Sequence, residues 1–183
     1  MKKNMARCLV YLNDLVRARE LLNTSIAEFK SAKPLNWAMI AAYQVLGTIE
    51  RREGNSELAE ASFIEAHNLW LKSDQTRLHP FNASCIYKTG VACLDQGKVE
   101  AAVKHLRDSI EVTNVHKKSM PIEHARALFK LSEALIQENY NGNEEEARRL
   151  REEAESYLRE REPNASDSGT EDAYDRFVPI FWR

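Results

Sequence analysis

Apolar and small side chains recur in this chain with the period of an α-helix, in segments that follow short polar turns. After the turn at Gly54-Asn55, the residues Ala59, Phe63 and Ala66 fall on one face of a helix. Gly and Asn tolerate the left-handed backbone that a sharp reversal needs, and an early Ala lets the second helix approach the first closely. The pattern therefore predicts a hairpin of two antiparallel helices.

The same spacing occurs four times along the chain. Each turn residue is followed by Ala five positions later, and by two further marks four and seven positions after that Ala. The four sets are Asn13 with Ala18, Leu22 and Ser25; Gly54 with Ala59, Phe63 and Ala66; Gly97 with Ala102, Leu106 and Ser109; and Gly142 with Ala147, Arg151 and Ala154. Successive turn residues are 41, 43 and 45 positions apart. This period is typical of stacked helix pairs, because one hairpin cannot bury both of its apolar faces.

The first helix of each pair shares this register. A small residue stands seven positions before each turn, except in the fourth copy, where three additional residues displace it; these residues are Ala6, Gly47, Gly90 and Ser132. Pro34, Pro80 and Pro121 mark the starts of the later first helices, where proline is tolerated. The expected pairs are 2–12 with 14–30, 35–52 with 57–73, 81–95 with 98–115, and 122–139 with 143–161. The predicted fold class is all-α, an α-solenoid of about four antiparallel helix pairs.

This order of residues resembles the pattern of the tetratricopeptide repeat (TPR): a small residue, a turn, Ala, a large or long residue, and a second small residue. It is clearest in the second copy, at Leu46-Gly47, Gly54, Ala59, Phe63 and Ala66. The chain therefore resembles TPR proteins over roughly residues 1–160, and its longer period is similar to the kinesin-light-chain-like subclass. It is also similar to the C-terminal repeat regions of fungal signalling ATPases. The resemblance implies a right-handed solenoid that acts as a protein–protein interaction scaffold.

The resemblance also implies that the first helices line a concave face where a peptide or protein partner binds. In this register the candidate partner-binding residues are Lys3, Arg7, Gln44, Thr48, Arg51, Tyr87, Lys88, Arg126, Phe129 and Lys130, with Val91 and Glu133 beside them. Together they are basic and carry two aromatic rings, which fits an extended ligand with acidic groups or a free carboxylate. Each residue taken singly is also an ordinary exposed helix residue. The Lys/Asn/Arg clamp of chaperone-binding TPR proteins is missing, because Thr48 and Val91 occupy its asparagine positions.

Composition narrows the function classes. The net charge of −2 favours no nucleic-acid partner, and no apolar run is long enough to span a membrane. Three widely spaced cysteines, Cys8, Cys85 and Cys93, fit a reducing compartment, so we expect a cytoplasmic protein. The five histidines belong to no catalytic or metal-binding signature; they are His67, His79, His105, His116 and His124. We therefore expect no catalytic, cofactor-binding or metal site and no enzyme activity.

The end of the chain changes character. The expected organisation is a TPR-like helical repeat domain at 1–162, a flexible linker at 163–170 and an aromatic C-terminal tail at 171–183. The tail crowds six apolar side chains, Tyr174, Phe177, Val178, Ile180, Phe181 and Trp182. Three alternatives stay open for it: it folds back over the repeats, it docks on another subunit or partner, or it is disordered in the isolated chain. The helix before it predicts the exposed ion pairs Glu144–Arg148, Glu145–Arg149 and Glu155–Arg159.

Two further hypotheses accompany the scaffold. The chain could be a sensor or oligomerisation arm related to a signalling ATPase of the STAND type, separated from its nucleotide-binding domain. Homo-oligomers would then form through the tail or through an apolar N-terminal edge with Leu9, Val10 and Leu12. A weaker third alternative is a regulator that responds to a peptide.

Overall fold

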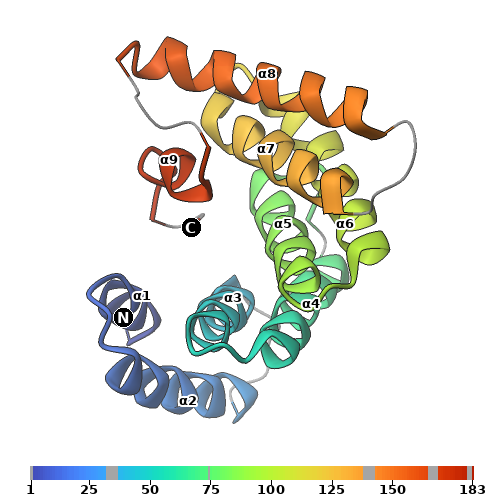
Figure 1. Cartoon of the computed structure of the whole chain (residues 1–183). Helices are drawn as coiled ribbons and strands as arrows, with labels where there is room; N and C mark the ends of the chain where they lie inside the picture. Colours follow the sequence, from blue (N-terminus) through green and yellow to red (C-terminus); the bar gives the residue numbers. More distant parts are fainter. Residues whose placement is uncertain (1, 32–36, 74, 138–142, 165–168, 181–182) are drawn as a thin grey trace. The chain divides into compact units, whose positions relative to one another are not determined.

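The computed structural model describes residues 2–31, 37–73, 75–137, 143–164, 169–180 and 183 (Figure 1). The chain divides into two compact units, an N-terminal unit, Met1–Arg77, and a C-terminal unit, Leu78–Arg183. Every regular element in the described ranges is a helix. None of these helices combines the length and apolarity needed to cross a membrane.

The N-terminal unit contains two helix pairs. Helices α1 (Lys2–Tyr11) and α2 (Leu15–Ser31) form the first pair, and α3 (Trp37–Arg52) and α4 (Ser56–Lys72) form the second. Helix α3 packs against both helices of the first pair, so the two pairs share a core. Val10, expected on an outward edge, is instead buried in this core, because it lies on the face of α1 that turns toward α2 and α3.

The C-terminal unit contains two further pairs and one short helix. Helices α5 (Pro80–Asp95) and α6 (Val99–His116) form the third pair, and α7 (Pro121–Gln137) and α8 (Asn143–Arg161) form the fourth. Helix α7 packs on α5, α6 and α8, and the five-residue helix α9 (Glu171–Asp175) packs on α7. The prediction of an all-α helical repeat is confirmed, and the handedness of the solenoid stays a prediction.

The turns between paired helices adopt the left-handed backbone that the sequence predicts. The φ angle is 62° at Asn13, 81° at Gly54 and 72° at Gly97. At each of them the next residue donates its N–H to the carbonyl oxygen five positions earlier, as in Asn55 to Glu50 at 2.8 Å. Gly142, and the expected boundary at Lys33-Pro34, lie outside the described residues.

The small residues of the first helices make room for large ones on the second. A Cβ atom added at Gly47 would lie 2.6 Å from Cε1 of Phe63, closer than two carbon atoms can approach. At Gly90 it would lie 2.9 Å from Cγ of Leu106 and 3.3 Å from the carbonyl oxygen of Ala102. The marks at minus seven and plus nine around the turns at Gly54 and Gly97 therefore meet in the seam between paired helices.

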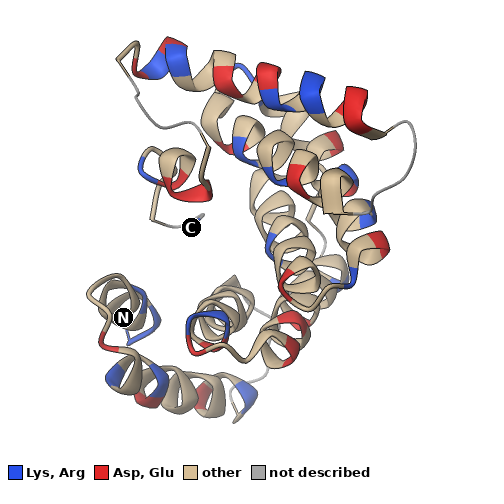
Figure 2. Ribbon diagram, in the orientation of Figure 1, with Lys and Arg blue, Asp and Glu red and all other residues tan. Residues whose placement is uncertain are grey.

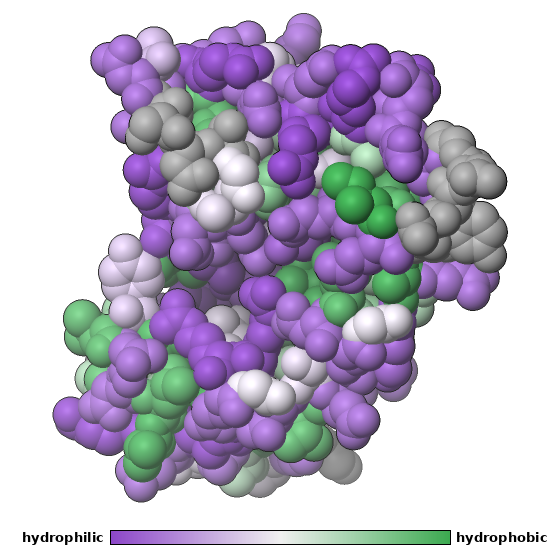
Figure 3. Space-filling view, in the orientation of Figure 1, coloured by the Kyte–Doolittle hydropathy of each residue, from purple (hydrophilic) through white to green (hydrophobic). Residues whose placement is uncertain are grey.

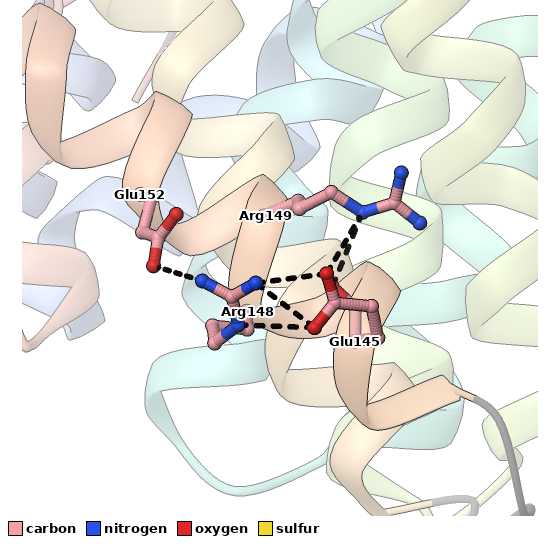
Figure 4. A network of polar contacts seen from close by, with 4 residues as sticks. All are labelled: Glu145, Arg148, Arg149 and Glu152. Atoms are coloured by element: carbon pink, nitrogen blue, oxygen red, sulfur yellow. Dashed lines mark hydrogen bonds and ion pairs between the residues drawn. The ribbon is translucent and has the colours of Figure 1, made fainter.

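Helix α8 presents a charged outer face (Figures 2 and 3). Arg148 bridges Glu145 at 2.8 Å and Glu152 at 2.6 Å, and Arg149 lies 3.7 Å from Glu145 (Figure 4). The predicted pairs Glu145–Arg149 and Glu155–Arg159 form, whereas Arg148 pairs with Glu145 and Glu152 in place of Glu144. Pairs this exposed contribute little to stability, because solvent screens their charges, so this face needs no partner to explain its charges.

A buried polar pair joins α6 to α7. The hydroxyl of Thr113 lies 2.9 Å from Nδ1 of His124, and the imidazole rests edge-on against the ring of Tyr157. Burial, followed by the nearby charge of Lys117, lowers the pKa of His124 to about 4. The imidazole is therefore neutral in the folded chain near neutral pH.

We expect Gly47→Ala to lower the free energy of unfolding by about 1–3 kcal/mol, because its Cβ meets an enclosed phenyl ring. Gly90→Ala should cost less, because its Cβ would lie 2.9 Å from the nearest atom instead of 2.6 Å, and the first pair already places Ala6 and Leu22 at these positions. Both changes gain the same helix propensity, so the difference between their urea midpoints isolates the steric effect. Equal losses would contradict this account of the seam.

We also expect the free energy of unfolding to decrease at acidic pH, because His124 is buried in its neutral form. Its pKa is below the ordinary 6.5, so the unfolded chain takes up the proton more readily, and stability decreases as the pH falls from 6.5 toward 4. The loss by pH 5 should reach about 1–2 kcal/mol. Urea unfolding at pH 7 and pH 5 checks this, with His124→Gln expected to flatten the dependence and His67→Gln to retain it. A His124→Gln chain as acid-sensitive as the wild type would refute the assignment.

Candidate functional site

Helix α7 uses three faces. One face joins α8, where Ala125 and Leu128 pack in one core cluster with Ala154 and Leu158. A second face packs on α5 and α6 through four apolar residues, Ala127, Leu131, Ala134 and Leu135. The third face carries the α7 triplet, which we define as Arg126, Phe129 and Lys130. Because the first two faces make the contacts with α5, α6 and α8, the third face can carry charged side chains.

The C-terminal helix α9 places two carboxylates opposite the cations of this face. Nη1 of Arg126 lies 2.6 Å from Oδ1 of Asp175, and Nζ of Lys130 lies 3.0 Å from Oε2 of Glu171. The Arg126 side chain is only 4% exposed, and the Lys130 side chain is 10% exposed. Charge-assisted hydrogen bonds at such sites are stronger than exposed ion pairs.

An aromatic contact lies between the two ion pairs. The rings of Phe129 and Tyr174 have centroids 5.0 Å apart at an angle of 32°, and both side chains are fully buried. Ala173 and Val178 of the tail belong to the same core cluster. The tail is thus part of the core of the C-terminal unit, in addition to its ionic contacts.

The α7 triplet contacts a triplet of residues on α9 whose order along the chain is reversed. The α9 triplet is Glu171, Tyr174 and Asp175. Both triplets have the spacing i, i+3, i+4, which places three side chains on one helical face. Cation, aromatic and cation on α7 therefore face acid, aromatic and acid on α9, with the two helices antiparallel.

Helix α5 extends the basic surface. The Tyr87 hydroxyl donates to Oε1 of Glu171 at 2.8 Å, and the Arg126 guanidinium lies 4.3 Å from the centroid of the Tyr87 ring. Nζ of Lys88 donates to the main-chain oxygen of Arg183. We call Tyr87, Lys88, Arg126, Phe129 and Lys130 the α5/α7 surface.

The charges of this surface stabilise one another. Burial alone would lower the pKa of Lys130, but the carboxylates of Glu171 and Glu133 outweigh it, and the pKa is raised. Burial, followed by the charge of Glu171, raises the pKa of Tyr87 well above its ordinary value. The lysine is therefore charged and the phenol neutral, so both donate hydrogen bonds to the same carboxylate.

The other candidate residues lie in the N-terminal unit. Lys3 and Arg7 stand one turn apart on α1; burial, followed for Lys3 by the charge of Arg7, lowers the pKa of each. On α3, Gln44 is buried, and Thr48 and Arg51 are half-buried. The structure thus brings five candidates together on the α5/α7 surface and two further groups onto α1 and α3. A single concave face made of all ten stays a prediction.

Some residues near the site differ from what the repeat register predicted. Val91 lies in the core cluster between α5 and α7, so it is a packing residue. Glu171 and Asp175 were not among the candidates, although their spacing around Tyr174 repeats that of the α7 triplet. Phe181 and Trp182, which the tail argument included, lie outside the described residues, and the boundaries 1–162, 163–170 and 171–183 stay predictions.

Comparison with known proteins identifies the repeats. Residues 38–114 match the tetratricopeptide-repeat family. Two crystal structures of nearly identical TPR-like repeats, described as a kinesin light chain of Podosopora anserina, share the fold with TM-scores of 0.53 and 0.54 at 14% identity. They cover 88% and 89% of this chain and 95% of their own. No curated protein matches the chain. The resemblance to TPR repeats of the kinesin-light-chain type is confirmed, and the similarity to fungal signalling ATPases stays a prediction.

We expect Asp175→Asn to lower the free energy of unfolding of the C-terminal unit by about 1–3 kcal/mol, because it removes the charge facing the buried Arg126. Glu171→Gln should cost about 1 kcal/mol, since the amide oxygen still accepts from Tyr87. Asp172→Asn is the matched control, because its side chain is exposed on the same helix. Urea midpoints check the order, and a control as costly as Asp175→Asn would contradict the ion-pair assignment.

Proposed function

We propose that this chain, which carries tetratricopeptide repeats at residues 38–114, is a protein–protein interaction scaffold that binds a peptide or protein partner on the α5/α7 surface. Tetratricopeptide repeats generally mediate interactions between proteins, and this role assigns no catalysis to the chain. Basic and aromatic side chains on the first helices of the pairs give the surface its preference for acidic partners.

One observation carries the proposal: the chain's own C-terminal segment already occupies the surface. Two carboxylates meet Arg126 and Lys130, and a tyrosine ring meets Phe129. A surface that holds an acidic, aromatic segment of its own chain has the chemistry to hold a similar segment of another protein. The combination of a buried aromatic anchor and desolvated charge pairs is also typical of binding hot spots.

The occupying helix is short enough to be displaced. Helix α9 has five residues, and a helix of this length has no stability of its own in water. Its order depends on contacts with α7, while the short connection to α8 holds it at an effective concentration of roughly millimolar. A partner with additional contacts can therefore compete for the surface even though the tail is tethered.

The test uses the full chain with the tail weakened by Glu171→Gln and Asp175→Asn, and a fluorescent peptide of residues 169–183 as the probe. Fluorescence anisotropy should show saturable binding, with an affinity that falls as salt rises. Adding Lys130→Gln should weaken binding about tenfold, because it removes the cation that receives Glu171. Lys104→Gln, an exposed change on α6, is the matched control. Absence of saturable binding, or equal effects of the two lysine changes, would refute the proposal.

A further inference from the structure

The tail contacts the α5/α7 surface as a helix. Its inward side chains are Glu171, Tyr174, Asp175 and Val178, which have the spacing of one helical face. The helical turn continues past α9, because Phe177 N donates to Tyr174 O at 3.0 Å and Val178 N donates to Asp175 O at 3.2 Å. The bound tail is therefore helical, whereas the repeat pattern alone predicted an extended peptide.

An extended peptide cannot reproduce these contacts. Residues four apart on a helix are separated by about 6 Å along its axis, which is also the separation of Arg126 and Lys130 along α7. An extended segment could match two carboxylates by placing them two residues apart, since each residue spans about 3.3 Å. The residue between them would then point to the opposite side, and Phe129 would lose its aromatic partner.

The buried tyrosine hydroxyl sets a preference for the aromatic position. Within the described part of the chain, the Tyr174 oxygen is buried without a hydrogen-bond partner. Burial, followed by the charge of Glu155, raises the pKa of Tyr174 to about 12 against the opposing charges of Arg151 and Arg159, so the group is a neutral hydroxyl in a buried site. A hydroxyl in such a site loses its bonds to water without replacement, whereas a phenyl ring would make the same contacts at no such cost.

We propose that the partner recognised by the α5/α7 surface is a short amphipathic helix of the form acid-x-x-Phe-acid-x-x-aliphatic, which binds antiparallel to α7. The tail is a weaker version of this ligand, because it carries Tyr174 where the surface favours Phe. A protein partner with the phenylalanine therefore displaces the tail. This inference rests on the proposed function and adds to it the conformation, spacing and aromatic residue of the ligand.

The test titrates four peptides of equal length against the full chain carrying Glu171→Gln and Asp175→Asn. One peptide has the stated form, one replaces its Phe by Tyr, one moves the second acid by a single position, and one has a proline in the middle of the helix. The stated form should bind about tenfold more tightly than the Tyr peptide, since the tyrosine hydroxyl loses its bonds to water without replacement. The shifted and proline peptides should bind at least tenfold more weakly than the Tyr peptide.

The outcomes separate this inference from the proposed function. Equal binding of all four peptides, still weakened by Lys130→Gln, would overturn the helical motif and leave the scaffold proposal standing. Absence of binding by every peptide would overturn both. A Tyr peptide that binds more tightly than the Phe peptide would overturn the aromatic preference. The reverse experiment introduces Tyr174→Phe into the otherwise unchanged chain. This change should strengthen the contact of the tail with the α5/α7 surface and weaken binding of the first peptide about tenfold. An unchanged affinity for the peptide would contradict the preference for phenylalanine.

Discussion

A steric match between a small residue on one helix and a large residue on its partner sets how the paired helices approach. Gly47 accepts Phe63 and Gly90 accepts Leu106, while the left-handed turns at Gly54 and Gly97 return the chain in register. This seam uses one face of each first helix, and packing against the neighbouring pair uses a second. On α7 a third face carries Arg126, Phe129 and Lys130, which contact the C-terminal tail.

On α7 this third face is a line of cation, ring and cation that would be costly to bury alone. The tail removes the cost by supplying carboxylates to Arg126 and Lys130 and a ring to Phe129. Few residues are involved, and the tyrosine hydroxyl remains unmatched within the described residues. The contact is thus complementary in charge but short, as the proposed displacement of the tail requires.

Most of the fold could be predicted from the sequence, because each repeat marks its turn and its seam with residues that only those positions require. The α7 residues of the site followed from the same register. Their partners did not, because α9 is too short to show a helical period and its order depends on tertiary contacts. Val91 was misplaced because α5 packs against α7 on the side where the register expected an open surface.

The most direct measurement of the central claim is the nuclear Overhauser effect between the rings of Phe129 and Tyr174 in the wild-type chain. Their centroids are 5.0 Å apart, so ring protons should give cross-peaks that do not change with protein concentration. This result would show that the tail of each chain occupies its own α7. Absence of these cross-peaks, with Tyr174 at the chemical shifts of a solvent-exposed tyrosine, would contradict the account.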